Sequence, residues 1–226
     1  MRRKESEFKT IFFSESGTQK INNDYFGYVQ LDNYAIWVIA DGYDGEEGAN
    51  IASKLSVESA IEYFTAHPRF NKEVIKELFK YTNDTIKQKQ EEMERYSLMH
   101  TSLLIVISNY NKILYGNIGN TRLYHIQGGY IVNQSSDDSV SQLLVQERAL
   151  DIKDIKSHRQ RNDLLQAIGD YSKIKPTISN EIKLLEGDKI CLTTRGAWEN
   201  IDEHEIEVEL SKFPERELWI DSIKRK

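Results

Sequence analysis

Two aspartates stand out in this sequence because both lie in short polar motifs at turns. Asp41 directly follows the apolar run 34–40 and precedes Gly42, and Asp24 closes an Asn-Asn-Asp triplet. Carboxylate oxygens are the hard ligands that Mg²⁺ and Mn²⁺ prefer, so these side chains could form part of a metal centre. Taken alone, Asp41-Gly42 is equally typical of a turn and Asp24 of a surface acid. The interpretation therefore depends on the rest of the chain.

The elements that must position these residues follow from the hydrophobic pattern. Residues 34–40 are rich in β-branched and aromatic side chains and predict a buried strand that ends in a turn. Two helices are predicted next, because apolar side chains cover most of the circumference of residues 49–64 and form one stripe along residues 71–95. We expect these helices to lie antiparallel on one outer face of a sheet.

From Thr101 onward the pattern changes to short strands separated by turns. The predicted strands are 102–108, 112–118, 122–126, 130–133 and 188–193. A weak helix is expected at 139–146, a short helix at 159–168 capped by Gly169, and helical spacing at 217–226. This order of elements indicates an α+β fold in which antiparallel sheets carry helices on their outer faces.

Composition and charge exclude several classes of protein. Thirty Lys and Arg against thirty-six Asp and Glu give a net charge of −6, so the overall field would repel a polyanion and argues against nucleic acid as a partner. The longest apolar runs, such as 34–40 and 103–107, are far shorter than the roughly 20 residues of a membrane-spanning helix. We therefore expect a cytoplasmic protein with no membrane partner. The single cysteine, Cys191, excludes an internal disulfide.

Six motifs in order resemble the metal-dependent protein phosphatase family of type 2C. Together they cover residues 14–221, nearly the whole chain, which we interpret as a single domain (1–226). The similar segments are Asn-Asn-Asp at 22–24, the Asp-Gly loop at 40–48, Gly-Asn-Thr-Arg-Leu-Tyr at 119–124, Ser-Asp-Asp-Ser at 136–139, the Asn-to-Gly segment 162–169, and the block from Gly-Asp at 187–188 through 194–199. A lone Asp-Gly turn carries little weight, whereas six motifs in family order are strong support.

The resemblance implies a four-layer α/β/β/α sandwich of two antiparallel sheets flanked by helix pairs, and hydrolysis of phosphoserine or phosphothreonine. Two Mg²⁺ or Mn²⁺ ions about 3.5–4 Å apart would lower the pKa of a bridging water, which attacks phosphorus in line. Asp41 matches the aspartate that bridges both ions, and Asp24 matches the acidic residue on the neighbouring strand. The Gly42 carbonyl matches the backbone ligand, where glycine would let the chain approach the ion.

Several positions depart from the pattern that the resemblance implies. The second metal aspartate is Arg195 here, a change of two charge units in a side chain that stays protonated. The glycine-flanked aspartate of the strand motif is Asn120, whereas Arg122, structural in the family, is kept. The third metal aspartate begins the family's final strand, which this domain is expected to lack. Asp221 is either its remnant or a surface acid, and the helical spacing around it favours a surface acid.

The phosphate-binding position also differs. The family's phosphate-binding arginine falls on Gln19, with Lys20 beside it. Lys20 could supply positive charge at a substrate site but not a bidentate fork. Both residues are therefore candidate substrate-binding residues with a weaker grip on phosphate than arginine would give.

The sequence therefore favours a pseudophosphatase that binds or regulates a phosphorylated protein or a protein kinase, with Mn²⁺ or Mg²⁺ held weakly if at all. One alternative is an active Mn²⁺- or Mg²⁺-dependent phosphatase with unconventional ligands such as Asp44, Glu46 or Glu199. Another is a chain cut before its final strand. An unpaired guanidinium beside two carboxylates would be costly. We therefore expect the Arg195 guanidinium to lie within salt-bridge reach of Asp41, Asp24 or both.

Overall fold

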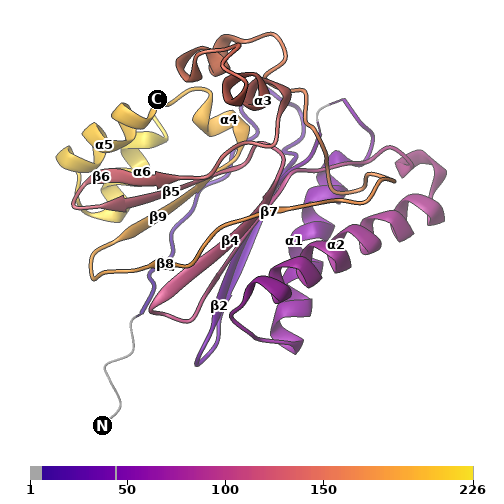
Figure 1. Cartoon of the computed structure of the whole chain (residues 1–226), viewed down its shortest axis with the longest axis horizontal. Helices are drawn as coiled ribbons and strands as arrows, with labels where there is room; N and C mark the ends of the chain where they lie inside the picture. Colours follow the sequence, from indigo (N-terminus) through magenta and orange to yellow (C-terminus); the bar gives the residue numbers. More distant parts are fainter. Residues whose placement is uncertain (1–6, 44, 226) are drawn as a thin grey trace.

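The computed structural model describes residues 7–43 and 45–225. Within them, two antiparallel sheets stack face to face, and a pair of helices covers the outer face of each sheet (Figure 1). The α+β class and the four-layer α/β/β/α arrangement implied by the sequence are confirmed.

The first sheet has six strands, with β1, β2, β3 and β4 side by side and two short strands, β7 and β8, both on β4. Their bounds are β1 Asp24–Gln30, β2 Ala35–Asp41, β3 Leu103–Ser108, β4 Lys112–Ile118, β7 Thr177–Ile178 and β8 Ile182–Lys183. In the register of β1 and β2, Asp24 lies opposite Asp41. The two aspartates therefore meet at one end of the sheet.

The second sheet has three strands in the order β6-β5-β9. Their bounds are β5 Arg122–Gln127, β6 Tyr130–Gln134 and β9 Lys189–Thr193. Apolar side chains of both sheets, including Trp37, Val106 and Leu192, form the core between them. The predicted strands of both sheets are confirmed to within a residue or two.

The long helices α1 (Ala49–Ala66) and α2 (Lys72–Glu92) lie together on the outer face of the six-stranded sheet (Figure 1). Asn71 caps α2, because its side chain accepts a hydrogen bond of 2.8 Å from the Val74 N–H. Residues 94–96 form a separate 3₁₀ turn, η1 (Glu94–Tyr96), so α2 ends slightly before the predicted boundary. The predicted helix pair and its place in the fold are confirmed.

The C-terminal helices α5 (Glu203–Lys212) and α6 (Arg216–Ile223) cover the three-stranded sheet. A capping box begins α5, in which Asp202 and Glu205 each bond the other's backbone N–H. Cys191 on β9 packs against this layer, and burial raises the pKa of its thiol to about 12. Three shorter elements, α3, η2 and α4, occupy the end of the sandwich; their bounds are α3 Val140–Gln146, η2 Ile152–Ser157 and α4 Arg195–Trp198.

The predicted helix over 159–168 is wrong. These residues form turns and isolated bridges, and several of their backbone groups pair with distant segments instead of continuing a helical ladder. Ile168 and Thr101 exchange two hydrogen bonds of 2.9 and 3.1 Å, and Leu165 N–H donates to Asp138 O at 3.1 Å. Gly169 (φ +104°) is therefore part of a turn against Met99, not a helix cap.

Candidate metal centre

Asp24 and Asp41 lie at the same end of neighbouring strands, as the sequence motifs predict. The Asp41 backbone is fixed by Ser102, whose N–H donates to Asp41 O at 2.9 Å. Thr194 Oγ1 donates to Asp24 Oδ2 at 2.7 Å, and the Arg195 N–H donates to Asp41 Oδ2 at 3.4 Å. The turn from β9 into α4 thus contacts both aspartates from a segment more than 150 residues further along the chain.

Gly42 is required by packing as well as by any role in metal binding. A Cβ at this position would lie 2.2 Å from the carbonyl oxygen of Ala49, at the start of α1. The Gly42 N–H donates to Asn23 O at 3.0 Å, so the residue also joins the two aspartate motifs. The structure therefore supplies a reason for this glycine that the sequence alone did not reveal.

Arg195 has a different partner from the one expected. Among the described residues, its guanidinium forms an ion pair with Glu199, with Nη1 3.5 Å from Oε2, and not with Asp41 or Asp24. Arg195 begins α4 and Glu199 directly follows it, so the two side chains are one helical turn apart and lie together. Glu199 also accepts a hydrogen bond of 3.0 Å from Arg161 Nε. The substituted arginine is therefore one member of an Arg-Glu-Arg chain.

A buried ion pair packs against Trp198 at the end of α4. Arg122 donates from Nε and Nη2 to the Asp137 carboxylate at 2.8 and 2.6 Å, and its guanidinium lies 3.6 Å from the centre of the Trp198 ring. Trp198 Nε1 in turn donates to the backbone oxygen of Asn120 at 2.7 Å. Burial raises the pKa of Asp137, and the hydrogen bonds from Arg122 oppose that shift. Arg122 thus has the structural role expected of it.

Glu46, one of the unconventional ligands considered above, is engaged elsewhere. Its carboxylate accepts from the His100 N–H at 2.9 Å and lies 3.1 Å from His100 Nδ1, while His100 Nε2 is 3.6 Å from Asp170 Oδ1. This acid-histidine-acid bridge braces the loop before α1 against the turn at Gly169. Nothing in the sequence pattern indicated it, because its three members are far apart in the chain. Asp44, another proposed ligand, lies outside the described residues.

The candidate substrate-binding residues lie on an exposed turn before β1. The Gln19 N–H donates to Ser16 O at 2.9 Å, and the side chains of Gln19 and Lys20 are exposed. Within the described ranges, neither forms a hydrogen bond or ion pair with Asp24 or Asp41, so their role in substrate binding stays a prediction. Asp221 is exposed on α6, as the helical spacing favoured.

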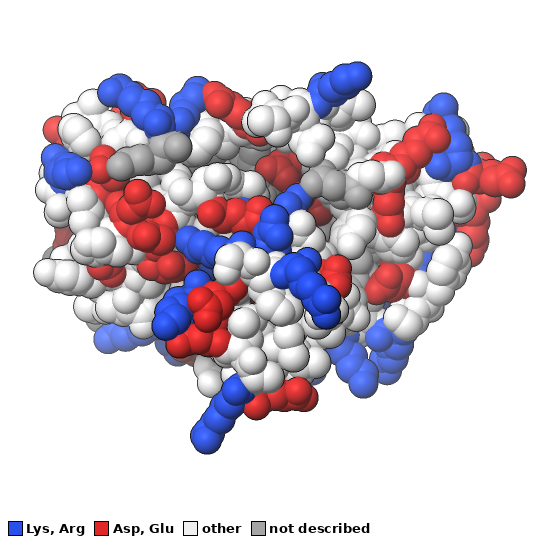
Figure 2. Space-filling view, turned by 90° about the horizontal axis from the view of Figure 1, so that it is seen from above, with Lys and Arg blue, Asp and Glu red and all other residues white. Residues whose placement is uncertain are grey.

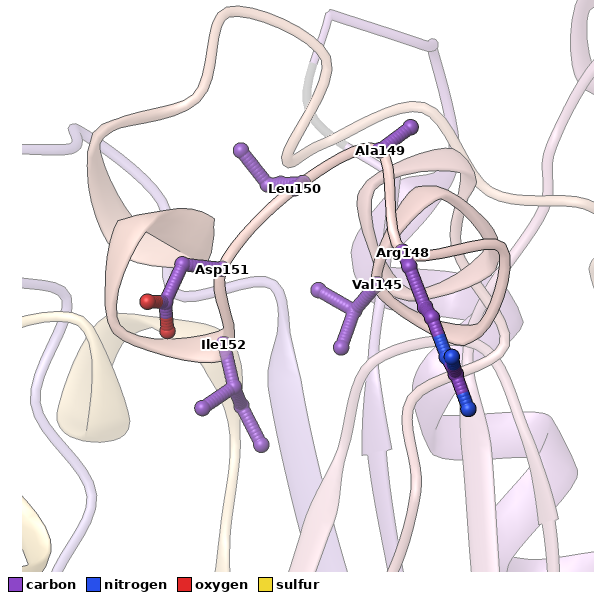
Figure 3. Close-up of a pocket in the computed structure, with 6 residues that line it drawn as sticks. All are labelled: Val145, Arg148, Ala149, Leu150, Asp151 and Ile152. Carbon is purple, nitrogen blue, oxygen red and sulfur yellow. The ribbon is translucent and has the colours of Figure 1, made fainter.

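The end of the sandwich that carries α3 and α4 presents a mixed surface. Figure 2 shows Lys and Arg side chains interleaved with Asp and Glu side chains near the centre of this face. A depression of about 570 Å³ beside α3 is lined by Val145, Leu150 and Ile152, with Arg148 and Asp151 on opposite sides (Figure 3). Its lining residues include neither Asp24 nor Asp41, and none of them belongs to the Arg-Glu-Arg chain.

The described residues do not by themselves fit a two-metal centre. Among the described residues, no group of three or more His, Cys, Asp or Glu side chains is arranged to hold a metal ion. Asp24 and Asp41 are hard oxygen donors, but a hydroxyl and a backbone N–H already donate to their carboxylates. The guanidinium of Arg195 stands where the resemblance places the second metal aspartate. The donors that the described residues supply are therefore fewer than the oxygen ligands that Mg²⁺ or Mn²⁺ requires.

A four-layer sandwich with paired aspartates at one sheet end defines the class of the type 2C serine/threonine phosphatases. The chain belongs to this family, because the family model described as protein phosphatase 2C matches residues 14–213.

Several known proteins are similar to it. The protein phosphatase PhpP of Streptococcus pneumoniae (strain D39) is 27% identical over 198 residues, 85% of this chain and 80% of PhpP. The structure of Stp1 from Staphylococcus aureus matches with a TM-score of 0.85 at 22% identity, covering 100% of this chain and 92% of Stp1. The catalytic domain of PstP, solved in complex with two manganese ions, matches with a TM-score of 0.78 at 19% identity, over 92% and 85%.

No helix in the described part of the chain combines the length and the apolar character that crossing a membrane requires.

Proposed function

We propose that this protein is a pseudophosphatase, a phosphatase-shaped domain that binds or regulates a phosphorylated protein or a protein kinase without hydrolysing phosphate esters at a useful rate. The observation that carries the proposal is Arg195, which contacts Asp41 through its backbone and Glu199 through its side chain. A fixed positive charge at this point repels a divalent cation. Two-metal catalysis needs both ions to generate and orient the attacking hydroxide.

The partner class is inferred from the relatives. PhpP and its counterparts are protein phosphatases by name, and the Listeria relatives are named serine/threonine phosphatases. A domain of the same shape presents its site to the same kind of ligand, a phosphorylated serine or threonine on a protein. The proposed setting is the cytoplasm, where such phosphoproteins and their kinases occur.

An active enzyme remains the second candidate, because one specific observation favours it. Asp24 and Asp41 are retained and lie opposite each other in the β1–β2 register, which is the pair of carboxylates that a metal phosphatase needs first. In this candidate, Mn²⁺ or Mg²⁺ would bind to Asp24, Asp41 and the Gly42 carbonyl and supply a nucleophilic hydroxide. Arg195 would then have to release its contacts to admit a further ligand.

Hydrolysis of phosphoserine and phosphothreonine peptides separates the two candidates. We expect turnover near background in excess MnCl₂, with the same residual rate in EDTA and in the variant Asp41→Ala. Asp221→Ala is the matched control, because it removes an exposed carboxylate on α6 that lies outside the site. Robust Mn²⁺-dependent turnover that Asp41→Ala abolishes and Asp221→Ala preserves would establish the active enzyme.

A further inference from the structure

The depression beside α3 has an apolar lining that comes from two short elements and the link between them. Val145 lies on α3, Leu150 lies in the link, and Ile152 begins η2. The depression measures about 570 Å³, and Ile152 leaves 63% of its surface exposed (Figure 3). Removing such apolar surface from water is favourable, so the depression suits an apolar side chain of a ligand.

The two charged residues that line the depression differ in their partners. The Asp151 carboxylate accepts a hydrogen bond of 3.3 Å from the Lys153 N–H and lies 3.4 Å from Lys153 Nζ. The exposed guanidinium of Arg148, in contrast, forms no hydrogen bond or ion pair with any residue that the structure describes. The charge left without a partner beside the apolar lining is therefore positive. A guanidinium pairs best with a carboxylate or a phosphate, so the ligand should also carry a negative charge.

Arg148 has a backbone conformation that arginine rarely adopts. Its φ is +61°, in the left-handed region, where the chain leaves α3. The N–H groups of Ala149 and Leu150 both donate to Leu144 O, at 2.8 and 3.2 Å, which fixes this turn. Glycine is the residue that such helix ends favour, because it has no Cβ to clash. Arg148→Gly therefore removes the charge without straining the fold.

The depression lies at the same end of the sandwich as α4. Lys156 on η2 donates from Nζ to Ile201 O at 3.0 Å, just beyond the end of α4. The turn before α4 contacts the paired aspartates, as described above. A segment seated in the depression is therefore on the end of the molecule that a partner of the aspartate site would approach.

We propose that this depression docks an acidic and apolar segment of the phosphorylated partner protein, with an apolar side chain between Val145 and Ile152 and a neighbouring carboxylate on Arg148. Such a contact deepens the proposed function, on which it rests, by adding a docking site that does not use the phosphate. The occupant is a protein segment because the site combines apolar surface with one unpaired positive charge. Leu or Ile next to Asp or Glu supplies both complements, whereas a free anion supplies only one.

Fluorescence anisotropy with labelled, unphosphorylated peptides tests this docking site on the full chain. The probe carries Leu between two Asp residues in a Gly-Ser background. Three comparison peptides replace Leu by Ser, both Asp by Asn, or both Asp by Lys. We expect the Asp-Leu-Asp peptide to bind most tightly and its affinity to fall as salt is added, because salt screens an exposed ion pair.

Two variants of the chain locate the binding. Arg148→Gly and Ile152→Ser should each weaken binding of the Asp-Leu-Asp peptide about tenfold, because one removes the charge partner and the other removes apolar lining. Lys80→Ala is the matched control, since Lys80 is a cation on α2 whose side chain is 79% exposed, and it should bind as the wild type does. Melting temperatures verify that each variant is folded, and Arg148→Asn, which also tolerates the left-handed region, is a second variant at this position.

Three results would overturn the proposed docking site. They are no binding of the Asp-Leu-Asp peptide at millimolar concentration, equal or tighter binding of any comparison peptide, and unchanged affinity in either folded variant. A dimer in light scattering that Arg148→Gly dissociates would also overturn it, because the occupant would then be a second copy of this chain. Phosphopeptide turnover by the wild type would refute only the pseudophosphatase, because the probe carries no phosphate.

Discussion

Removing the charge of Arg122 should destabilise this protein more than removing any exposed charge. The pair of Arg122 with Asp137 is almost fully buried, with exposed side-chain fractions of 5% and 2%, and its geometry is bidentate. In the variant Arg122→Met, a buried carboxylate loses its partner, which costs about 3–5 kcal/mol of unfolding free energy. Loss of the contact between the guanidinium and Trp198 costs at most about 2 kcal/mol more, and part of this cost is already included in the first figure.

The expected total is roughly 4–6 kcal/mol, equivalent to a fall in melting temperature of about 10–20 °C for a chain of this size. Urea unfolding followed by circular dichroism at pH 7 measures it directly. Lys54→Met is the matched control, because the side chains of Lys54 and its partner Glu58 are both more than half exposed, and it should leave the free energy nearly unchanged.

The pH dependence of the variant provides an independent check. Burial already raises the pKa of Asp137, and loss of Arg122 should raise it further. A carboxyl group whose pKa is raised by folding stabilises the native state below its unfolded pKa, and that contribution is lost as the pH rises through the folded pKa. Arg122→Met should therefore lose less stability at pH 4 than at pH 7. A cost at pH 7 below about 1 kcal/mol, typical of an exposed pair, would refute the reasoning.

Two further stability predictions concern a glycine and a carboxylate. Gly42→Ala should lower the melting temperature, because the new methyl group would lie 2.2 Å from Ala49 O, whereas Gly196→Ala, with open space around it, should not; equal effects would contradict the packing argument. Burial by itself would raise the pKa of Asp188, but hydrogen bonds from Gln127, the Leu185 N–H and His125 hold this pKa below its usual value. The ionised Asp188 carboxylate therefore stabilises the folded state above its unfolded pKa of about 3.9, and this stabilisation is lost as the pH falls through the folded pKa. Urea unfolding at several pH values between 6 and about 2 should show that the unfolding free energy of Asp188→Asn depends less on pH than that of the wild type. Identical slopes for the two proteins would rule out this stabilising role of Asp188.

Much of the fold could be predicted because its signals are local. The apolar run before Asp41 and the stripe of α2 record burial in the spacing of side chains, and that spacing follows directly from the geometry of strands and helices. The segment 159–168 misled the prediction for the same reason. Its local spacing resembles a helix, but the backbone groups of Ile168 and Leu165 pair with Thr101 and Asp138, which no local pattern records.

The candidate site was likewise predicted in part from the sequence, and the rest was decided by the tertiary structure. The order of the motifs indicated that Asp24 and Asp41 belong to one centre, and the identity of residue 195 showed that a guanidinium replaces a carboxylate there. The resemblance to the family also implied a structural role for Arg122. These conclusions came from matching residue types and their order along the chain to the family's motifs.

The partners of these residues were decided by the tertiary structure. Glu199 joins Arg195 to Arg161, and Glu46 is held by His100 instead of facing the aspartates. The prediction that Arg195 would pair with Asp41, Asp24 or both considered the charges but not the direction of the helix on which Arg195 lies. Opposite charges attract over several ångströms in every direction, so the sequence shows only which side chains could pair. Which pair forms depends on the backbone that aims each side chain, and that backbone is fixed by contacts between residues far apart in the chain.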